Sequence, residues 1–243
     1  MNFNEEKIFR VFVDFDGTIT KTDVGEAMFV KFGDEKKANE IIQLWINKKL
    51  SSVQTWHMLC DTVKNLDLRE FDEFIDSIEI DQSFKRFVDY CNAGDIYISI
   101  LSDGLDYYIN RILKREGLET VSAYTNELTF DLNNNLIPVF KYTDEECLNC
   151  ANCKRNHIIN NSSDNDYTIY IGDGWSDTCP AQFCDFIFAK NSLLKFCDTN
   201  RISYFPFKNF DEIILRIEEM KKKRRLKKRH QAELKRREVY LQG

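Results

Sequence analysis

The chain has 243 residues, of which 43% are hydrophobic and 30% are charged, and its formal net charge is −6. This size and composition are enough for one large core, or for a core with a small satellite domain, and they exclude a disordered chain. No charged-then-apolar leader opens the sequence and no apolar run is long enough to cross a bilayer, so we expect a cytoplasmic protein without a membrane partner.

The first predicted element is a short strand of Val and Phe over residues 11–13, buried on both faces. Asp14 and Asp16 follow at its carboxyl end, where parallel sheets bind ligands, and the alternation of side chains turns both to one side. Two such carboxylates repel each other unless a cation lies between them or one holds a proton, and hard oxygen ligands suit Mg²⁺. The stretch therefore favours a magnesium site, an acid–base role, or both; a simple turn or helix cap is the alternative.

Residues 23–84 contain no proline, and their apolar residues recur at helical spacing. We predict three or four helices here, forming a small all-helical cap over residues 22–84 that could close as a lid. An ordinary helical subdomain without a closing motion is the alternative. The catalytic core would then consist of residues 1–21 and 85–219. Asp23 lies nearest to the carboxylate pair, so we expect it to face the substrate.

A second buried strand is predicted over residues 96–101, and Ser102, Asp103 and Gly104 follow it. A hydroxyl and backbone N–H groups at the end of a strand, before a predicted helix near residues 108–113, suit a phosphate oxygen. A helix cap is the alternative, and both can be true. A hairpin is predicted next, with strands over residues 125–130 and 136–140.

Three cysteines at two-residue separations, Cys147, Cys150 and Cys153, precede Lys154 and His157. Three Cys and a His could bind zinc, but zinc ligands usually come from two separated arms. We favour thiols that shape the turn before Lys154. All eight cysteines are expected to be reduced, since no secretion signal accompanies them.

A third buried strand over residues 168–171 ends in Gly172, Asp173, Gly174 and, four residues after Asp173, Asp177. Four of the nine glycines fall at the ends of the three strands, where the chain must turn tightly. We therefore predict that the three strand ends form one site around a divalent ion. Further strands near residues 185–189 and 202–205 and a helix near 210–217 complete an α/β fold with a parallel sheet flanked by helices.

Four segments resemble, in order and spacing, the four motifs of the haloacid dehalogenase superfamily: 14–18, 102–104, Lys154 and 172–177. The superfamily implies a Rossmann-like core, and the position of the cap is similar to that of the phosphoserine phosphatase-like branch. Within that branch, residues 14–20, 150–154 and 170–174 look most similar to 2-hydroxy-3-keto-5-methylthiopentenyl-1-phosphate phosphatases.

The resemblance implies a role for each matching residue. Asp14 would attack phosphorus and form an aspartyl-phosphate, and Asp16 would serve as acid and then as base. Mg²⁺ would be bound by Asp14, Asp16, Asp173 and, in support, Asp177. Thr18, Ser102 and Lys154 would bind the phosphoryl oxygens, and Asp23, Ser102, Asp103 and Gly104 would contact the substrate.

Two residues depart from the pattern of phosphoserine phosphatases: Asp23 replaces Glu, and Asp103 replaces Gly. These departures put phosphoserine in doubt and keep phosphoethanolamine or phosphocholine open, because an acidic Asp103 could meet a cationic substrate group. A phosphotransferase or mutase is a further alternative. The predicted function is an Mg²⁺-dependent phosphatase that hydrolyses a small phosphorylated metabolite, with a 2-hydroxy-3-keto-5-methylthiopentenyl-1-phosphate as first candidate.

The last predicted segment is a basic C-terminal extension, residues 220–243, with 11 Lys/Arg and 2 Asp/Glu. Residues 1–219 hold 23 Lys/Arg and 38 Asp/Glu, a net charge of −15, so we do not expect this acidic body to bind nucleic acid. Residues 221–237 read as a solvated, fraying helix or loose tail. The non-enzymatic alternative is a scaffold that binds RNA or a partner through this tail.

Overall fold

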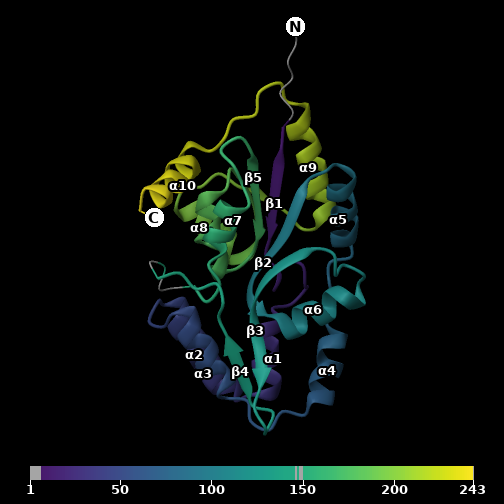
Figure 1. The fold of residues 1–243 in the computed structure, drawn as a ribbon, viewed down its shortest axis with the longest axis vertical. Helices are drawn as coiled ribbons and strands as arrows, with labels where there is room; N and C mark the ends of the chain where they lie inside the picture. Colours follow the sequence, from purple (N-terminus) through teal and green to yellow (C-terminus); the bar gives the residue numbers. More distant parts are fainter. Residues whose placement is uncertain (1–6, 146, 148–149, 243) are drawn as a thin grey trace. The chain divides into compact units, whose positions relative to one another are not determined.

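The computed structural model describes residues 7–145, 147 and 150–242, and it divides into two compact units (Figure 1). Unit 1 consists of the chain up to Asp14, Asp81–Ile100 and the chain from Arg155 onward, and unit 2 consists of Phe15–Ile80 and Leu101–Lys154. Within the described residues, seven strands are hydrogen-bonded in the order β4-β3-β2-β1-β5-β6-β7. β1 pairs in parallel with β2 and with β5, and β6 pairs in parallel with β5 and with β7, whereas β3 and β4 are antiparallel. This arrangement confirms the predicted α/β class.

Unit 1 is built on a parallel sheet. β1 (Phe9–Val13) lies between the first half of β2 (Tyr97–Leu105) and β5 (Tyr167–Gly172). Phe12, Val13 and Ile171 are fully buried, as expected of strands covered on both faces. The remaining elements of this unit are β6 (Phe186–Ala189), β7 (Phe205–Pro206), α5 (Ser83–Ala93), α8 (Asn191–Thr199), α9 (Phe210–Lys222), α10 (His230–Gln242), η1 (Trp175–Asp177) and η2 (Pro180–Phe183). α7 (Lys154–Asn160) begins at the boundary between the units.

Unit 2 contains the four helices of the segment predicted to be a helical cap: α1 (Val24–Phe32), α2 (Glu35–Ile46), α3 (Ser52–Cys60) and α4 (Leu68–Ser77). Each helix is preceded by an N-cap residue whose side chain accepts a backbone N–H of the first turn. These residues are Asp23, Asp34, Ser51 and Asp67. The unit also contains the second half of β2, α6 (Asp106–Arg115) and the predicted hairpin, β3 (Ser122–Phe130) with β4 (Leu136–Val139). The number of helices and the hairpin are thus confirmed.

Two expectations about elements are wrong. β2 does not end at Leu101 but continues through Ser102, Asp103 and Gly104 to Leu105, because Leu105 is as fully buried as Leu101. The C-terminal extension is not a loose tail, because α10 packs on η2 with Ala232 fully buried and Arg236 only 5% exposed.

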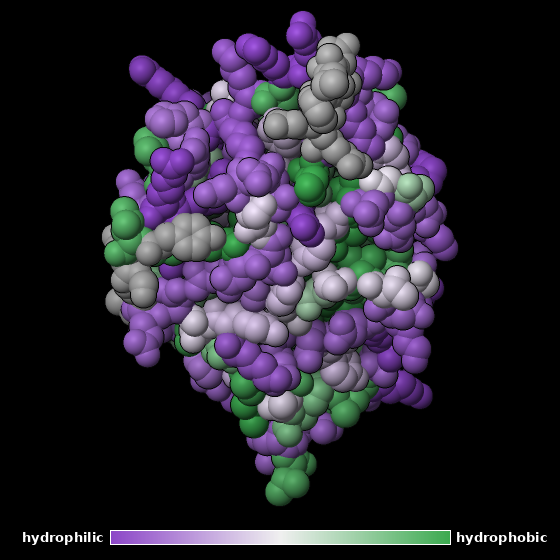
Figure 2. All heavy atoms as spheres, turned by 45° about the horizontal axis from the view of Figure 1, so that its top comes forward, coloured by the Kyte–Doolittle hydropathy of each residue, from purple (hydrophilic) through white to green (hydrophobic). Residues whose placement is uncertain are grey.

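Hydrophilic side chains cover most of the molecular face in Figure 2, and hydrophobic side chains lie between them in small groups. In the part of the chain that the structure describes, no helix combines the length and the apolar character that a bilayer crossing requires.

Candidate active site

The carboxyl ends of β1 and β5 bring three carboxylates together in unit 1. The two strands are parallel, with Val13 beside Ile171, and the N–H of Asp14 donates to the Ile171 carbonyl at 2.9 Å. Asp14 and Asp173 each follow directly after their strand, and Asp177 closes the turn beyond β5. One oxygen of each of the three carboxylates lies within 4.8 Å of the others. The predicted convergence of Asp14, Asp173 and Asp177 is therefore present.

Asp177 holds the turn that carries Asp173. Its Oδ2 accepts the N–H groups of Asp173 and Gly174, each at 2.9 Å, and its Oδ1 accepts the Tyr170 hydroxyl at 2.5 Å. A Cβ on Gly172 would lie 2.5 Å from Asp177 Oδ2, so only glycine fits there. Burial, and next the Asp177 charge, raise the pKa of Tyr170 well above its usual value, which keeps the phenol a donor. Asp177 thus orients the Asp173 backbone.

The donor set of this cluster fits a hard divalent cation. All its atoms are carboxylate oxygens, which Mg²⁺ prefers, and three such charges this close repel one another without a counter-ion. The side-chain amide of Asn191 donates to Asp173 Oδ2 at 3.1 Å and orients that carboxylate. Both oxygens of Asp177 accept hydrogen bonds, so this carboxylate is held in a fixed position within the cluster.

Asp16 lies at the centre of a hydrogen-bonded group in unit 2. Its Oδ2 accepts the Tyr108 hydroxyl at 2.8 Å and the Ser102 hydroxyl at 3.3 Å, and its Oδ1 accepts the N–H of Val24 at 3.2 Å. Ser102 Oγ in turn accepts the N–H of Gly104 at 2.9 Å. A Cβ on Gly104 would collide with both the Tyr108 hydroxyl and Asp16 Oδ2. Glycine at position 104 therefore gives Tyr108 access to Asp16.

The pKa of Asp16 is raised from 3.8 to about 7, first by desolvation and next by the charge of Asp23, while Tyr108, Val24 and Lys154 oppose the rise. A carboxyl group that titrates near neutral pH can both donate and accept a proton under working conditions. Burial raises the pKa of Tyr108 well above 10, so its hydroxyl stays protonated and remains a donor to Asp16.

The remaining predicted residues of the first motif have local partners. Gly17 has a φ of 74°, a backbone conformation that favours glycine and lets the chain turn after β1. Thr18 is 1% exposed, and its N–H donates to the Phe15 carbonyl. Asp23 is exposed and caps α1 by accepting the N–H of Glu26 at 2.8 Å. Its expected contact with substrate stays a prediction.

Asn152 joins the second motif to the loop before Lys154. Its N–H donates to Asp103 Oδ1 at 2.9 Å, and its side-chain amide donates to the carbonyls of Ser102 and Tyr124 at 2.7 and 2.9 Å. Its own carbonyl accepts the N–H of Lys154 at 2.8 Å. The Asp103 carboxylate therefore holds this loop through the backbone of Asn152. Lys154, which is 2% exposed, is bonded to the same residue through its own N–H.

The cysteine cluster is also part of this loop. Cys147 and Cys150 are half-buried, with their sulfur atoms 3.5 Å apart, and Cys153 is buried. Among the described residues, the group able to hold a metal is the acidic cluster, and the cysteines with His157 do not form a second one. Burial lowers the pKa of His157 to about 4. The thiols are therefore best explained as packing of the loop, and no disulfide joins the eight cysteines.

The sequence-based prediction of the site missed four partners: Tyr108, Tyr170, Asn152 and Asn191. In the sequence, Tyr108 and Tyr170 have the pattern of ordinary core residues of a helix and a strand. The one available signal was Asn152, a polar residue between Cys150 and Cys153 and two positions before Lys154.

Comparisons with known proteins agree with this geometry. Residues 9–196 match the model of a family described as "Putative Phosphatase". The 2-hydroxy-3-keto-5-methylthiopentenyl-1-phosphate phosphatase of Bacillus cereus (strain ATCC 10987 / NRS 248) is 32% identical over 209 residues, covering 84% of this chain and 93% of the relative. The enzyme of the same name from Bacillus anthracis is 32% identical over 211 residues, with the same coverage.

Solved structures of phosphoserine phosphatases share the fold. A phospho-aspartyl intermediate analogue of phosphoserine phosphatase has a TM-score of 0.68 at 19% identity, covering 87% of this chain and 99% of that chain. An apo phosphoserine phosphatase has a TM-score of 0.63 at 17% identity, covering 86% of this chain and 98% of that one. The chain is therefore a phosphatase that belongs to the "Putative Phosphatase" family, and it has the fold of the phosphoserine phosphatases.

Proposed function

We propose that the chain is an Mg²⁺-dependent phosphatase of a small phosphorylated metabolite and that it works through an aspartyl-phosphate on Asp14. The observation that carries the proposal is the cluster of Asp14, Asp173 and Asp177 at the ends of β1 and β5. Asp14 and Asp173 would hold the ion, together with the Asp16 backbone carbonyl that the superfamily pattern uses. Bound there, Mg²⁺ would offset the negative charge of the phosphoryl group and of the carboxylates.

Asp14 is the proposed nucleophile. It is 4% exposed, and its position is set by the hydrogen bond from its own N–H to Ile171. Attack of a carboxylate oxygen on phosphorus forms an acyl phosphate as the bond to the leaving oxygen breaks, and water then releases phosphate. This division replaces one difficult displacement by two easier ones.

Asp16 is the proposed acid and base. Its raised pKa, about 7, allows it to protonate the leaving alkoxide and then, as a carboxylate, to take a proton from the attacking water. Ser102, Thr18 and Lys154 are the proposed ligands of the phosphoryl oxygens, where charge accumulates in the transition state.

The proposed substrate is a 2-hydroxy-3-keto-5-methylthiopentenyl-1-phosphate, the compound named for the relatives that are 32% identical. The contact between Asp103 and the Asn152 N–H supports a substrate without a cationic group. It gives the Asp103 carboxylate a structural partner, so an ammonium such as that of phosphoethanolamine is not needed to balance it. The reduced thiols are consistent with a cytoplasmic enzyme.

The test measures phosphate release with Mg²⁺ from this compound, phosphoserine, phosphoethanolamine and phosphocholine. We expect the first to be hydrolysed most efficiently, and chelation with EDTA should abolish release until Mg²⁺ is restored. Asp14→Asn should abolish activity, whereas Asp89→Asn, at an exposed position of α5, should not. Activity that survives Asp14→Asn would mean that the nucleophile is misassigned, and release that requires an added hydroxyl acceptor would indicate a phosphotransferase.

A further inference from the structure

The segment that leads from the end of α9 to α10, residues 221–229, carries an unusual charge and includes the last two residues of α9. Eight of its nine residues are Lys or Arg, and Leu226 is the exception, whereas residues 1–219 have a net charge of −15. We call residues 221–229 the basic segment. It belongs entirely to unit 1, and no step of the proposed phosphatase mechanism uses it.

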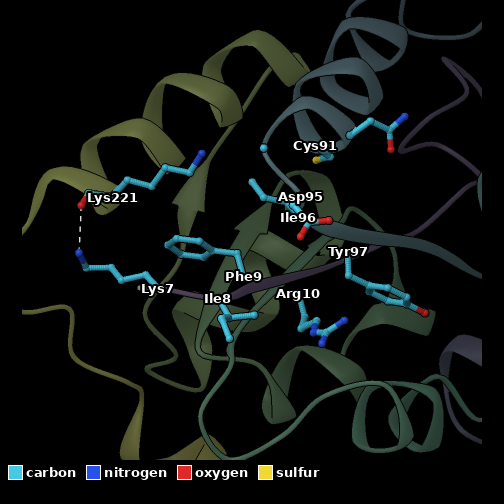
Figure 3. Close-up of a pocket in the computed structure, with 11 residues that line it drawn as sticks. Lys7, Ile8, Phe9, Arg10, Cys91, Asp95, Ile96, Tyr97 and Lys221 are labelled. Atoms are coloured by element: carbon cyan, nitrogen blue, oxygen red, sulfur yellow. Dashed lines mark hydrogen bonds between the residues drawn. The ribbon is translucent and has the colours of Figure 1, made fainter. Parts of the chain in front are cut away.

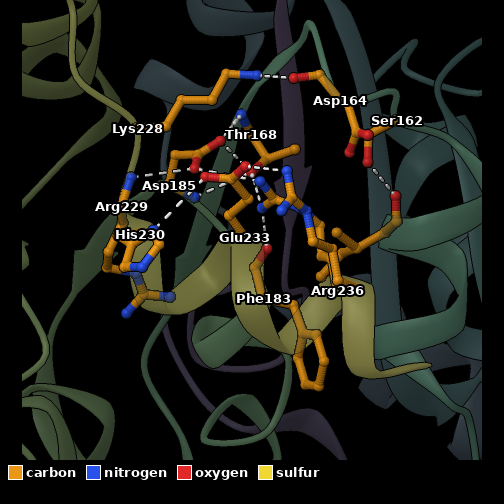
Figure 4. Close-up of polar contacts among 12 residues, drawn as sticks. Ser162, Asp164, Thr168, Phe183, Asp185, Lys228, Arg229, His230, Glu233 and Arg236 are labelled. Atoms are coloured by element: carbon orange, nitrogen blue, oxygen red, sulfur yellow. Dashed lines mark hydrogen bonds and ion pairs between the residues drawn. The ribbon is translucent and has the colours of Figure 1, made fainter. Parts of the chain in front are cut away.

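The basic segment is held against the core at its beginning and in its middle. Lys7 Nζ donates to the Lys221 carbonyl at 3.0 Å, next to a pocket that both residues line (Figure 3). The Tyr167 hydroxyl donates to the Leu226 carbonyl at 3.0 Å, and Lys228 Nζ donates to the Asp164 carbonyl (Figure 4). These contacts fix the path of the backbone across the end of the sheet.

The C-terminal end of the basic segment is fixed by one buried ion pair and several hydrogen bonds around Asp185 (Figure 4). Asp185 Oδ1 accepts the N–H of Arg229 at 3.3 Å and pairs with Arg236 at 3.4 Å, and Arg236 also donates to the Phe183 carbonyl at 2.5 Å. Asp185 Oδ2 accepts the N–H and the hydroxyl of Thr168. The side chains of Arg236 and Asp185 are 6% and 0% exposed, so α10 is a docked helix and the basic segment cannot move as a free tail.

Five charged side chains of the basic segment are exposed on the surface: Lys222, Lys223, Arg224, Arg225 and Lys227. Five neighbouring cations on a fixed backbone repel one another. A solvated tail would reduce this repulsion by moving its charges apart, but a fixed segment cannot. A fixed array also loses little conformational entropy when it binds, because the protein has already ordered it. Its chemistry is complementary to a polyanion with closely spaced charges.

We propose that the basic segment binds the phosphate backbone of a nucleic acid duplex. Six residues extend over at most about 20 Å, and a duplex presents one phosphate per roughly 1.7 Å of axis, so five cations can each meet a phosphate. The segment has no aromatic residue for stacking on single-stranded bases. Its only aliphatic side chain, Leu226, is half-buried, which disfavours insertion into a membrane. Contacts of this kind position the duplex without reading its sequence.

The experiment measures the fluorescence anisotropy of a labelled RNA duplex of about 20 base pairs, titrated with the full chain at several salt concentrations. Neutralising five phosphates should give a slope of about −4.5 in log affinity against log salt, or roughly 500-fold weaker binding between about 50 and 200 mM salt. A single strand of the same length should bind more weakly, with a slope of about −3.5.

The test variant replaces the five exposed cations of the basic segment with glutamine, and we expect duplex binding to be lost while phosphatase activity is kept. The matched control neutralises five exposed lysines of unit 2: Lys36, Lys37, Lys48, Lys49 and Lys64. This control has the same net charge as the test variant and should bind the duplex at least half as well as the parent chain. If the fivefold variant melts early, the pairs K222Q/K223Q and R224Q/R225Q should each reduce the slope by about 1.8.

The proposal is overturned if the parent chain does not bind the duplex at about 50 mM salt, or if the test and control variants lose binding equally. Binding to vesicles of phosphatidylcholine and phosphatidylserine without binding to the duplex would assign the basic segment to a membrane instead. None of these outcomes depends on the phosphatase assignment, because the duplex contains no substrate of that site.

Discussion

The hydroxyl of Tyr108 donates a hydrogen bond of 2.8 Å to Oδ2 of Asp16, the proposed acid and base. The tyrosine next to it on α6, Tyr107, makes a bond of the same length to Asp72. Two adjacent tyrosines thus each hold a carboxylate, but only Asp16 is the proposed acid and base. Comparing the two separates a positioning role from a merely structural one.

Removing the Tyr108 hydroxyl should slow the reaction. A hydrogen bond to a charged group contributes about 1.5–3 kcal/mol, so Tyr108→Phe should lower kcat by at least roughly tenfold, with little change in KM. Tyr107→Phe should leave kcat unchanged. Steady-state kinetics of both variants provide the check, and equal losses of kcat would show that the hydroxyl of Tyr108 has only a structural role.

The pH dependence should reveal the charge of Asp23. Asp16 must be protonated to act as an acid, and its pKa is about 7. The value of kcat/KM should therefore fall as the pH rises above neutrality. Since the Asp23 charge raises this pKa, Asp23→Asn should move the falling limb to lower pH.

The control for this prediction is Asp34→Asn. Asp34 caps α2 in the same way as Asp23 caps α1, and asparagine is an equally good cap, so neither variant should lose its helix. The measurement is the pH profile of kcat/KM between about pH 5 and 9 for both variants and the parent chain. A limb that does not move in Asp23→Asn would exclude a charge effect of Asp23 on Asp16.

The acidic cluster of Asp14, Asp173 and Asp177 could be predicted from the sequence because its residues follow local rules. The Phe and Val run of β1 and the apolar run of β5 each end directly before a carboxylate, and parallel strands bring their carboxyl ends together. Asp14 and Asp173 meet because β1 and β5 are also neighbours in the sheet. The expected tight turn at Gly172 is wrong: Gly172 is the last residue of β5, and glycine is needed there because the Asp177 carboxylate leaves no room for a Cβ.

The partners of Asp16 could not be predicted in this way. Tyr108 reaches Asp16 from a helix more than 90 residues further along the chain, and its sequence context is that of a buried core residue. The docking of α10 was missed for a related reason. Arg236 lies in a strongly basic stretch that reads as solvated, and only the fold places the buried Asp185 opposite it.

The pair between Arg236 and Asp185 should dominate the stability of the C-terminal extension. Arg236→Met leaves the carboxylate of Asp185 buried without its partner from α10, which should cost about 3–5 kcal/mol in the free energy of unfolding. Arg237→Ala should cost less than about 1 kcal/mol, because Arg237 is exposed and pairs with Glu233 on the surface of the same helix.

Urea unfolding at neutral pH measures both changes. The double variant Arg236→Met/Asp185→Asn should recover part of the loss, since it removes the buried charge as well. Equal stabilities of Arg236→Met and Arg237→Ala would contradict the buried pair as the element that docks α10.

His157 should make the protein sensitive to mild acid. Burial lowers the pKa of its side chain from 6.5 to about 4, so between these values the unfolded chain binds a proton that the folded chain does not. The free energy of unfolding therefore contains a contribution that is complete above about pH 6.5 and is lost as the pH falls toward 4, up to roughly 3 kcal/mol. His157→Gln should flatten this part of the pH dependence, whereas His230→Gln, at an exposed position of α10, should not. Urea unfolding of the three proteins between pH about 4 and 7 measures the difference, and parallel curves for His157→Gln and the parent chain would exclude a neutral, buried His157 as its source.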